Sequence, residues 1–470
     1  MNQFFKKIFG LKTRNEEDDL SDSIIFHGNT KIENSESDKV EVEESESTIP
    51  NEVIEPKFEI NDDSYSWKKP YDPLIDLRNY IFPDLALFSD SIQNTLYSFS
   101  AKSIGYKLPI LWSCSDNNLL VKDISGLANI LITGTQAKGK TNFIHQLIIS
   151  LLLTKHPSQL KLVLADIKGL DIGIYKLLEK HFLARLPETD DSILKDPKNL
   201  VHCLNAFCIE MDNRYDLIVE AGVRNITEYN TKFIQRKLNP EKGHQFLPFI
   251  IFIIDDLGLY TYQGFPEINL PLVRLVSEGY KAGIYTIIST SQTNTLSLPN
   301  NLLSMINQRV VFRLNSKEDY KRFFGTTKFE IPLEEGKFLY NENGHIQKGQ
   351  SILFPMDDIK KLVEFIADQP SYQQAFLLPE YVSEEEFENK TFDINDRDPL
   401  FEDAARLIVQ SQSGSTSLLQ RRMKLGYNRV GRIIDQLEAA GIVGPNQGSK
   451  VRDVLVKTDA ELKKYFSREK

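Results

Sequence analysis

A glycine-rich segment between two apolar stretches constrains this chain more than any other feature. It completes the pattern G-x-x-x-x-G-K-[ST] at Gly134, Gly139, Lys140 and Thr141. The apolar run 128–132 before it is typical of a buried strand, and residues 143–152 after it are typical of a helix. Between a strand and a helix, this pattern predicts a phosphate-binding loop.

The chemistry of that loop follows from its backbone. A turn that glycines permit can surround the β- and γ-phosphates of ATP with N–H groups, and the following helix N-terminus favours an anion. Lys140 would add a positive charge, and the Thr141 hydroxyl would bind Mg²⁺. ATP and Mg²⁺ are therefore the expected cofactors, with a coincidental glycine-rich turn as the alternative. The predicted nucleotide contacts are Gly134, Thr135, Gln136, Ala137, Lys138, Gly139, Lys140 and Thr141.

The acidic charge of the chain is concentrated near its N-terminus. The 470 residues carry a formal net charge of −10, and residues 1–66 alone, with 17 acidic and 7 basic side chains, account for all of it. The remainder is formally neutral, so the acidic balance does not argue against nucleic-acid binding. Residues 16–63 are rich in Glu, Asp and Ser and poor in aromatic residues, which predicts disorder.

Targeting signals are absent from the sequence. No segment approaches the roughly 20 apolar residues of a membrane-spanning helix, and no signal peptide is present, so we expect a cytoplasmic protein. Residues 1–14 mix apolar and basic side chains, which suggests peripheral membrane or partner contact, with an exposed N-terminus as the alternative. The three cysteines, Cys114, Cys203 and Cys208, are too scattered for a disulfide framework or a zinc site.

Apolar strand patterns alternate with helical patterns through the middle of the chain. Strands are expected at residues 160–166, 246–255 and 283–289 in addition to the strand before the loop, and such alternation predicts a mostly parallel sheet in an α/β fold. Three helices and a small hairpin near the C-terminus predict a winged helix. The expected segments are a disordered acidic tail (1–66), an adaptor packed on the motor (67–118), a P-loop ATPase motor (119–367), an acidic linker (368–397), the winged helix (398–458) and a C-terminal tail (459–470).

Two polar strand ends are candidates for the second half of an ATP site. The apolar run 251–254 leads into Asp255 and Asp256. Asp255 would hold Mg²⁺, and Asp256 would orient or deprotonate the attacking water. Gln292 follows another apolar strand, where it could sense the γ-phosphate. A solvated acidic turn and an ordinary loop glutamine are the alternatives.

Several segments beyond the phosphate loop follow the pattern of one known family. They are residues 166–168, 211–215, 222–230, 315–317, 398–401 and 426–434. On these segments the chain resembles the FtsK/SpoIIIE family of double-stranded DNA translocases over about residues 105–458.

The resemblance implies a RecA-like motor that assembles as a hexameric ring around duplex DNA and couples ATP hydrolysis to translocation. The winged helix would load it on short polar DNA sequences during chromosome segregation at cell division, and division or recombination proteins are possible partners. Because family ATP sites lie between subunits, Arg309 and Lys317 are candidates for contacts to a neighbour's nucleotide. Ordinary surface ion pairs are the alternative for both.

The sequence departs from the family pattern at positions that bear on hydrolysis. The family's loop has Gly-Ser where this chain has Ala137 and Lys138, and its acidic pair is Asp-Glu where this chain ends in Asp256. Tyr280, with Lys281 beside it, stands where an arginine finger is expected, and a lysine cannot reproduce the planar fork of arginine. We therefore expect slow hydrolysis with ATP binding retained. Many members also begin with membrane-spanning helices, which this sequence lacks.

The predicted winged helix carries the candidate DNA contacts. Residues 397–457 hold 10 basic and 6 acidic side chains. Its third helix should enter the major groove, where Asn428, Arg429 and Arg432 would face base edges. A winged helix that binds protein is the alternative. Phosphate contacts are expected from Arg421, Arg422 and Lys424 beside that helix and from Lys450 and Arg452 on the wing.

Three functions are compatible with these patterns. The first is an ATP-driven translocase of double-stranded DNA. The second is a DNA organiser or loader that binds ATP for assembly and hydrolyses it weakly. The third is a ring ATPase that moves protein substrates.

Overall fold

We describe a computed structural model of the chain. The predicted tail 1–66, including residues 1–14, lies outside the described residues, as do Lys138 and Lys450. Among the described residues, no helix combines the length and the apolar character needed to cross a bilayer. The structure describes residues 70–466 apart from 116–117, 138, 170–171, 188, 262–265, 296–297, 332–333, 343, 382–396 and 446–450.

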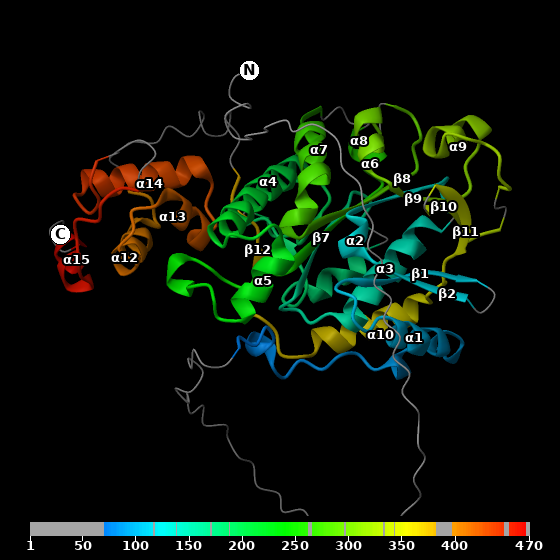
Figure 1. The fold of residues 1–470 in the computed structure, drawn as a ribbon, viewed down its shortest axis with the longest axis horizontal. Helices are drawn as coiled ribbons and strands as arrows, with labels where there is room; N and C mark the ends of the chain where they lie inside the picture. The colour runs from blue at the N-terminus through cyan, green and yellow to red at the C-terminus, as the bar shows by residue number, and fades with distance from the viewer. Residues whose placement is uncertain are drawn as a thin grey trace, which may run out of the picture. The chain divides into compact units, whose positions relative to one another are not determined.

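An eight-stranded sheet forms the centre of residues 119–367, the predicted motor (Figure 1). Its strand order is β11-β10-β9-β3-β8-β7-β4-β6. All neighbours from β9 to β6 are parallel, whereas β10 is antiparallel to both β9 and β11. The mostly parallel sheet predicted from the sequence is therefore confirmed. The strands are β3 (Asn129–Thr133), β4 (Leu160–Asp166), β6 (Ile193–Leu194), β7 (Phe249–Asp255), β8 (Ile284–Thr290), β9 (Gln308–Val311), β10 (Lys337–Glu342) and β11 (His345–Gln350).

Helices cover both faces of this sheet. Alternate residues of β7 enter opposite cores, with Ile251 and Ile253 in one and Ile250, Phe252 and Ile254 in the other. This explains why β7 is continuously apolar, since a parallel strand buried on both faces has no polar side. The first core is closed by α1 (Asp90–Lys102), α3 (Lys140–Thr154) and α10 (Met356–Ala367), and the second by α4 (Pro197–Glu220), α7 (Asn269–Glu278), α8 (Asn300–Met305) and α9 (Lys317–Phe324).

Shorter helices connect these main elements. The α-helical ones are α2 (Ile124–Leu127), α5 (Ile226–Ile234) and α6 (Leu257–Thr261). The 3-10 turns are η3 (Ile75–Leu77), η4 (Leu85–Leu87), η5 (Gly173–Leu178), η6 (Pro240–Lys242), η7 (Pro266–Ile268) and η8 (Gly279–Ala282).

The adaptor predicted at 67–118 packs on the motor core, but its expected end is misplaced. The strand β1 (Pro109–Ser115) pairs with β2 (Asn118–Asp123) in an antiparallel hairpin that crosses the predicted boundary. Trp112 of β1 is fully buried and stacks edge-on against Phe143 of α3. The hairpin is thus one unit with the motor core.

The first part of the predicted linker 368–397 is also ordered against the motor. The short strand β12 (Phe376–Leu377) pairs in parallel with β5 (Ala184–Arg185), and Leu378 is fully buried. Apolar residues inside an acidic segment thus find a motor surface, which the charge pattern alone did not indicate. The remainder of this segment, residues 382–396, is outside the described residues.

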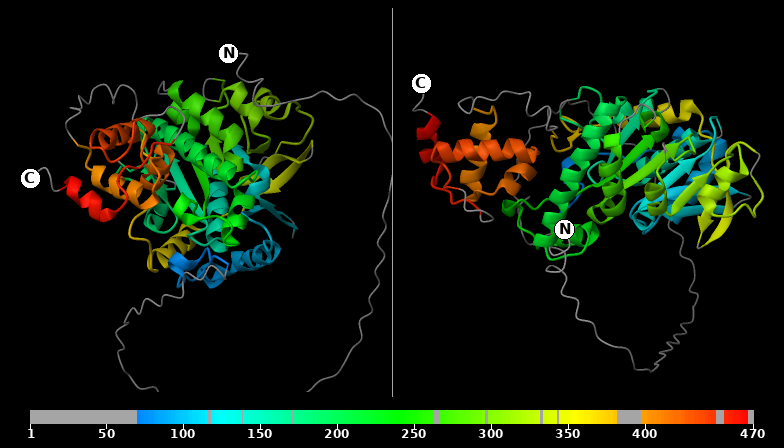
Figure 2. Two further views of the ribbon diagram at one scale, coloured as in Figure 1. Left: turned by 60° about the vertical axis from the view of Figure 1, so that its left-hand side comes forward. Right: turned by 90° about the horizontal axis from the view of Figure 1, so that it is seen from above.

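The C-terminal helices form a cluster with its own core (Figure 2). Its helices are α12 (Phe401–Ser411), α13 (Thr416–Met423) and α14 (Tyr427–Ala439), and an antiparallel bridge joins Val443 to Val454. This is the predicted arrangement of three helices and a hairpin. Residues 459–470 are not simply a tail, because α15 (Asp459–Phe466) buries Leu462 in the same core.

Candidate functional site

The candidate nucleotide site lies where three parallel strands end. Since β8 lies between β3 and β7, its carboxyl end separates the loop after β3 from the acidic pair after β7. Ligands of open α/β sheets bind outside these carboxyl ends. The strand order therefore brings the phosphate loop and the acidic pair to the same edge of the sheet. Each of the two sequence motifs had indicated one half of such a site.

The end of β9 supports the phosphate loop. Thr135 donates its backbone N–H to the carbonyl of Arg313 at 2.9 Å. Phe312 packs so closely that a Cβ at Gly134 would lie 2.6 Å from its Cβ, and one at Gly139 would lie 2.9 Å from its Cε1. Both glycines also have positive φ angles, of 157° and 109°. Any larger side chain would clash with Phe312 at either position, so the packing explains both glycines of the motif.

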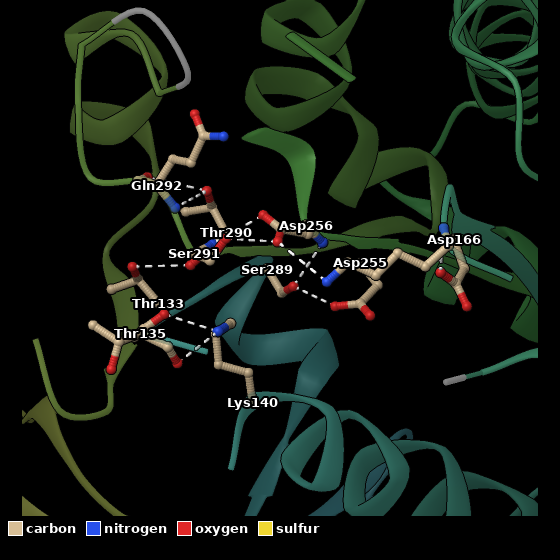
Figure 3. A network of polar contacts seen from close by, with 12 residues as sticks. Thr133, Thr135, Lys140, Asp166, Asp255, Asp256, Ser289, Thr290, Ser291 and Gln292 are labelled. Carbon is tan, nitrogen blue, oxygen red and sulfur yellow. Dashed lines mark hydrogen bonds and ion pairs between the residues drawn. The ribbon is translucent and has the colours of Figure 1, made fainter. Parts of the chain in front are cut away.

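Lys140 opens α3 and points back into this loop (Figure 3). Its Nζ donates to the carbonyls of Gly134 at 2.8 Å and Thr135 at 3.0 Å. The side chain is buried, so its charge lies inside the loop. This position is consistent with the predicted contact to phosphate.

Ala137 takes a backbone conformation that suits glycine. Its φ angle is +55°, in the left-handed region. This conformation costs about 1 kcal/mol or more for a residue with a Cβ. The predicted cost of replacing the family's glycine here thus has a geometric basis.

Two serines of the β8 end bind the acidic pair (Figure 3). The Ser289 hydroxyl donates to Asp255 Oδ1 at 2.6 Å and accepts the backbone N–H of Asp256 at 2.8 Å. Ser291 donates its N–H to Asp256 Oδ1 at 3.0 Å and its hydroxyl to Oδ2 at 2.6 Å. Both carboxylates are buried. Neither serine was predicted as a site residue, although polar residues that alternate at the end of an apolar strand are a signal for such a site.

A third acidic residue organises the loop after β4. Asp166 lies beside Asp255 in the sheet register and accepts the backbone N–H groups of Lys168 and Gly169, each at 3.0 Å. The loop places Lys168 Nζ 3.9 Å from Asp256 Oδ2. The motif at 166–168 therefore brings a cation to the acidic pair.

The residues at this edge fit a magnesium ion. Mg²⁺ prefers oxygen ligands and is held by one or two protein groups together with substrate phosphates. Thr141 follows Lys140 at the start of α3, and the Asp255 carboxylate ends β7 across the same edge. No cluster of three or more His, Cys, Asp or Glu side chains suited to a metal occurs among the described residues. This donor set suits an ion shared with a nucleotide.

Gln292 does not occupy the predicted sensor position. Its side chain points away from Lys140 and Asp255 in Figure 3 and packs beside Gly258, where a Cβ would lie 3.0 Å from it. Ser291, one residue earlier, faces the acidic pair instead. Side chains alternate in direction at a strand end, so Ser291 and Gln292 point to different sides.

The two candidates for contacts to a neighbouring subunit behave differently. Arg309 donates to the carbonyls of Leu303, Ile306 and Phe323 at 2.6–2.8 Å, and burial lowers its pKa. It joins α8 and α9 to β9, so the prediction of an intersubunit contact is wrong for this residue. Lys317 is exposed at the first position of α9 and stays a candidate.

The segment that replaces the arginine finger is held by α4. Tyr280 lies in η8 with 38% of its surface exposed, next to the exposed Lys281. The fully buried Arg214 of α4 donates to the carbonyl of Ala282, the last residue of η8, at 3.0 Å. Tyr215 donates its hydroxyl to the carbonyl of Glu278 at 2.8 Å. The signature residues 211–215 thus position η8.

In the winged helix, Arg429 is a structural clamp rather than an open base-reading side chain. It donates to Asp398 at 2.8 and 3.1 Å and to Glu380 at 3.0 and 3.1 Å. Burial alone would raise the pKa of Asp398, but the hydrogen bonds from Arg429 and the Leu400 N–H, together with the charges of Arg429 and Arg432, lower the pKa overall. The clamp thus joins Glu380 to Asp398 through one guanidinium group.

Other predicted phosphate contacts also have protein partners. Arg421 pairs with Glu220 at 3.1 Å, and Arg452 pairs with Asp435 at 2.8 Å and with Glu438. The structure therefore corrects the expectation that these cations are open to DNA.

Two further cations beside the third helix contact backbone carbonyls. Lys424 donates to the carbonyl of Leu377 at 2.5 Å, and burial lowers its pKa to about 8. Arg422 is exposed, although it donates to the carbonyl of Pro240 at 2.6 Å. Arg432 is half-buried on α14, and the side chain of Asn428 is outside the described residues.

Two family models match parts of this chain. The model of the FtsK/SpoIIIE family matches residues 107–327, and that of the Ftsk gamma domain matches residues 395–457. The DNA translocase FtsK of Chlorobaculum tepidum is 34% identical over 369 residues, which are 77% of this chain and 45% of the relative. That of Streptococcus pneumoniae is 30% identical over 71% of this chain and 43% of the relative. The chain thus spans less than half the length of these relatives.

Among solved structures, the pCW3 conjugation coupling protein TcpA with ATPγS aligns with 61% of this chain and 73% of its own. The TM-score is 0.47 and the sequence identity is 17%. At this level the likeness does not bear on function.

Proposed function

Because this chain belongs to the FtsK/SpoIIIE family, we propose that it is an ATP-driven translocase of double-stranded DNA that acts in chromosome segregation at cell division. One observation carries the proposal. The carboxyl edge of the sheet holds both the loop around Lys140 and the pair Asp255 and Asp256. The same chain also contains a winged helix.

The phosphate loop binds ATP in this proposal. Backbone N–H groups of residues 134–141 and the Lys140 ammonium contact the β- and γ-phosphates, which accumulate negative charge as the bond to the γ-phosphate breaks. Thr141 and Asp255 would hold Mg²⁺, which neutralises phosphate charge when bound. Preorganised donors of this kind stabilise the transition state because they need no rearrangement during the reaction.

Asp256 acts on the attacking water. Its carboxylate accepts a proton from the water that attacks the γ-phosphate, and the reaction releases ADP and inorganic phosphate. Lys317, exposed at the start of α9, would contact the nucleotide of a neighbouring subunit in a homo-hexameric ring.

The winged helix supplies the proposed contact to duplex DNA. The third helix, α14, would lie in the major groove, with Asn428 and Arg432 facing base edges and Lys450 on the wing facing phosphate. Further partners of the proposal are division or recombination proteins. The proposed location is the cytoplasm, with peripheral membrane contact through residues 1–14 or a partner.

A second function, a DNA organiser that binds ATP and hydrolyses it weakly, is favoured by two specific observations. Ala137 holds a left-handed φ of +55° in the loop, and Tyr280 stands where an arginine finger is expected. An arginine finger contributes about 10³- to 10⁵-fold to the hydrolysis rate in related chemistry. Slow turnover with intact ATP binding is the signature of this second function.

DNA-stimulated ATPase rates separate the two functions. The wild type, Lys140→Ala and the control Lys360→Ala, which changes an exposed residue of α10, are assayed with and without linear duplex DNA. The translocase predicts DNA-stimulated turnover in the wild type and the control and background turnover in Lys140→Ala. Wild-type turnover no higher than that of Lys140→Ala would refute the motor.

A further inference from the structure

We infer that Ser291 is the positioning residue that orients Asp256 for attack by water. This inference rests on the proposed function, since it assigns a role at the same ATP site. Ser291 is the residue that follows β8 directly, and β8 is the strand between β3 and β7. Among the described strands, only β8 lies between the strand before the phosphate loop and the strand before the acidic pair.

The hydrogen bonds from Ser291 fix both oxygens of the carboxylate. The backbone N–H reaches Oδ1 at 3.0 Å and the hydroxyl reaches Oδ2 at 2.6 Å. Two donors from one residue to two acceptor atoms prevent rotation about the Cβ–Cγ bond of Asp256. Each carboxylate oxygen has a second lone pair, so both remain able to accept a hydrogen bond from water.

The backbone of Asp256 turns its side chain toward this donor pair. Its φ angle is +57°, a left-handed conformation that a non-glycine residue adopts only when its surroundings hold it there. The Ser289 hydroxyl holds it by accepting the Asp256 N–H at 2.8 Å. Strain of this kind at a polar strand end is typical of functional sites.

Lys168 approaches the Asp256 carboxylate from the loop after β4, which flanks β7 on the side away from β8. Its Nζ lies 3.9 Å from Oδ2, and its side chain is 39% exposed against 6% for Asp256. The carboxylate therefore has a donor pair at hydrogen-bond distance on the β8 side and a long, partly exposed cation on the β4 side. Ser291 sets the direction of the carboxylate, because its donors are short and rigid.

This arrangement compensates for the short side chain of Asp256. An aspartate reaches one methylene less far than the glutamate of the family pattern, so its direction matters more. Displacement of a reacting group by about 1 Å can cost about 100-fold in rate. Ser291 supplies the orientation that Gln292, which points away, does not supply.

The test compares Ser291→Ala, which keeps the N–H and loses the hydroxyl, with Ser291→Thr, which keeps both donors. The control is Ser304→Ala, because the hydroxyl of Ser304 is exposed on α8 and bonds only locally, to the carbonyl of Asn301. The measurements are kcat and KM for ATP with duplex DNA present and the affinity for ATPγS, together with the melting temperature of each variant.

We expect Ser291→Ala to lower kcat about 10-fold or more while KM and the ATPγS affinity stay within 2-fold of wild type. Ser291→Thr should retain most of kcat, and Ser304→Ala should match the wild type. Wild-type kcat in Ser291→Ala would overturn the inference, as would equal losses in the alanine and threonine variants. Asp256→Asn separates the proposed role of Asp256 from the inferred role of Ser291. Wild-type kcat in Asp256→Asn would show that Asp256 is not the base. An inactive Asp256→Asn together with wild-type kcat in Ser291→Ala would refute only the role of Ser291.

Discussion

Sequence motifs indicate the positions of side chains better at the nucleotide site than in the winged helix. At the nucleotide site, the loop with Lys140 and the acidic pair lie together at the carboxyl edge of the sheet. Two separate sequence motifs had indicated these residues. In the winged helix, the predicted fold is present, but Arg421, Arg429 and Arg452 pair with carboxylates of the chain itself. Motif geometry is local to a strand and its loop. The partner of a long surface cation depends on tertiary contacts.

The strongest test of the nucleotide site is Lys140→Ala. The buried ammonium lies inside the phosphate loop, so its loss should reduce ATP affinity severely and bring hydrolysis to background. Equilibrium binding of a fluorescent ATP analogue, with Lys360→Ala as the matched control, measures this. Unchanged ATP affinity in Lys140→Ala would mean that the nucleotide binds elsewhere. The motifs would then be no better a guide at the nucleotide site than in the winged helix.

The clamp at Arg429 is the corresponding test in the winged helix. Arg429→Ala should lower the free energy of unfolding by about 2–4 kcal/mol, because it leaves the buried Glu380 carboxylate and the partly buried Asp398 carboxylate without their cation. Arg429→Lys should restore only part of this, since lysine lacks the planar fork. Denaturant unfolding checks the magnitudes. Unchanged stability together with lost DNA binding would instead make Arg429 a base-reading residue.

Acid should weaken the motor through His145. This histidine of α3 is buried against the Tyr175 hydroxyl at 2.9 Å, and burial lowers its pKa to about 4. Because the unfolded chain binds the proton near pH 6.5 and the folded chain does not, stability falls as the pH drops from about 6.5 to 4. The loss attributable to His145 reaches about 3 kcal/mol.

Unfolding measured at pH 7.5 and pH 5 checks this pH effect. His145→Gln should show a smaller loss of stability on acidification than the wild type, whereas the exposed His345→Gln should not differ from it. The winged helix contains no histidine between residues 398 and 470, so this source of acid sensitivity belongs to the motor alone. Equal pH slopes in the wild type and His145→Gln would refute the assignment.

The smallest expected effect concerns Ala137, which stands where the family's phosphate loop has glycine. Ala137→Gly should stabilise the protein by up to about 1 kcal/mol, because glycine tolerates the φ of +55°. The control Ala367→Gly, in the last turn of α10, should destabilise it, since a right-handed position gains nothing from glycine. Thermal unfolding reports both signs, and destabilisation by Ala137→Gly would contradict the strain argument.

The sequence predicted most of the fold and the centre of the site for a physical reason. Buried parallel strands are continuously apolar, and the loop and acids follow them directly along the chain. Gln292 failed because one residue changes the side of a strand end to which a side chain points. The partners of Arg309 could not be read from the sequence, because its three carbonyl acceptors lie in α8, just after α8 and in α9.

The winged-helix contacts required distant information. Arg429 meets Glu380 across 49 residues and Asp398 across 31. No pattern within α14 distinguishes a cation that binds a carboxylate from one that is open to DNA. The acidic composition of 368–397 indicated a linker, yet Leu378 inside it is fully buried.

The central claim is that hydrolysis at the Lys140 site moves the protein along duplex DNA. Displacement of a triplex-forming strand from linear duplex DNA measures this movement directly. We predict displacement by the wild type with ATP and none with ATPγS or in Lys140→Ala. ATP-independent displacement, or none by a wild type that binds both ATP and DNA, would contradict the account.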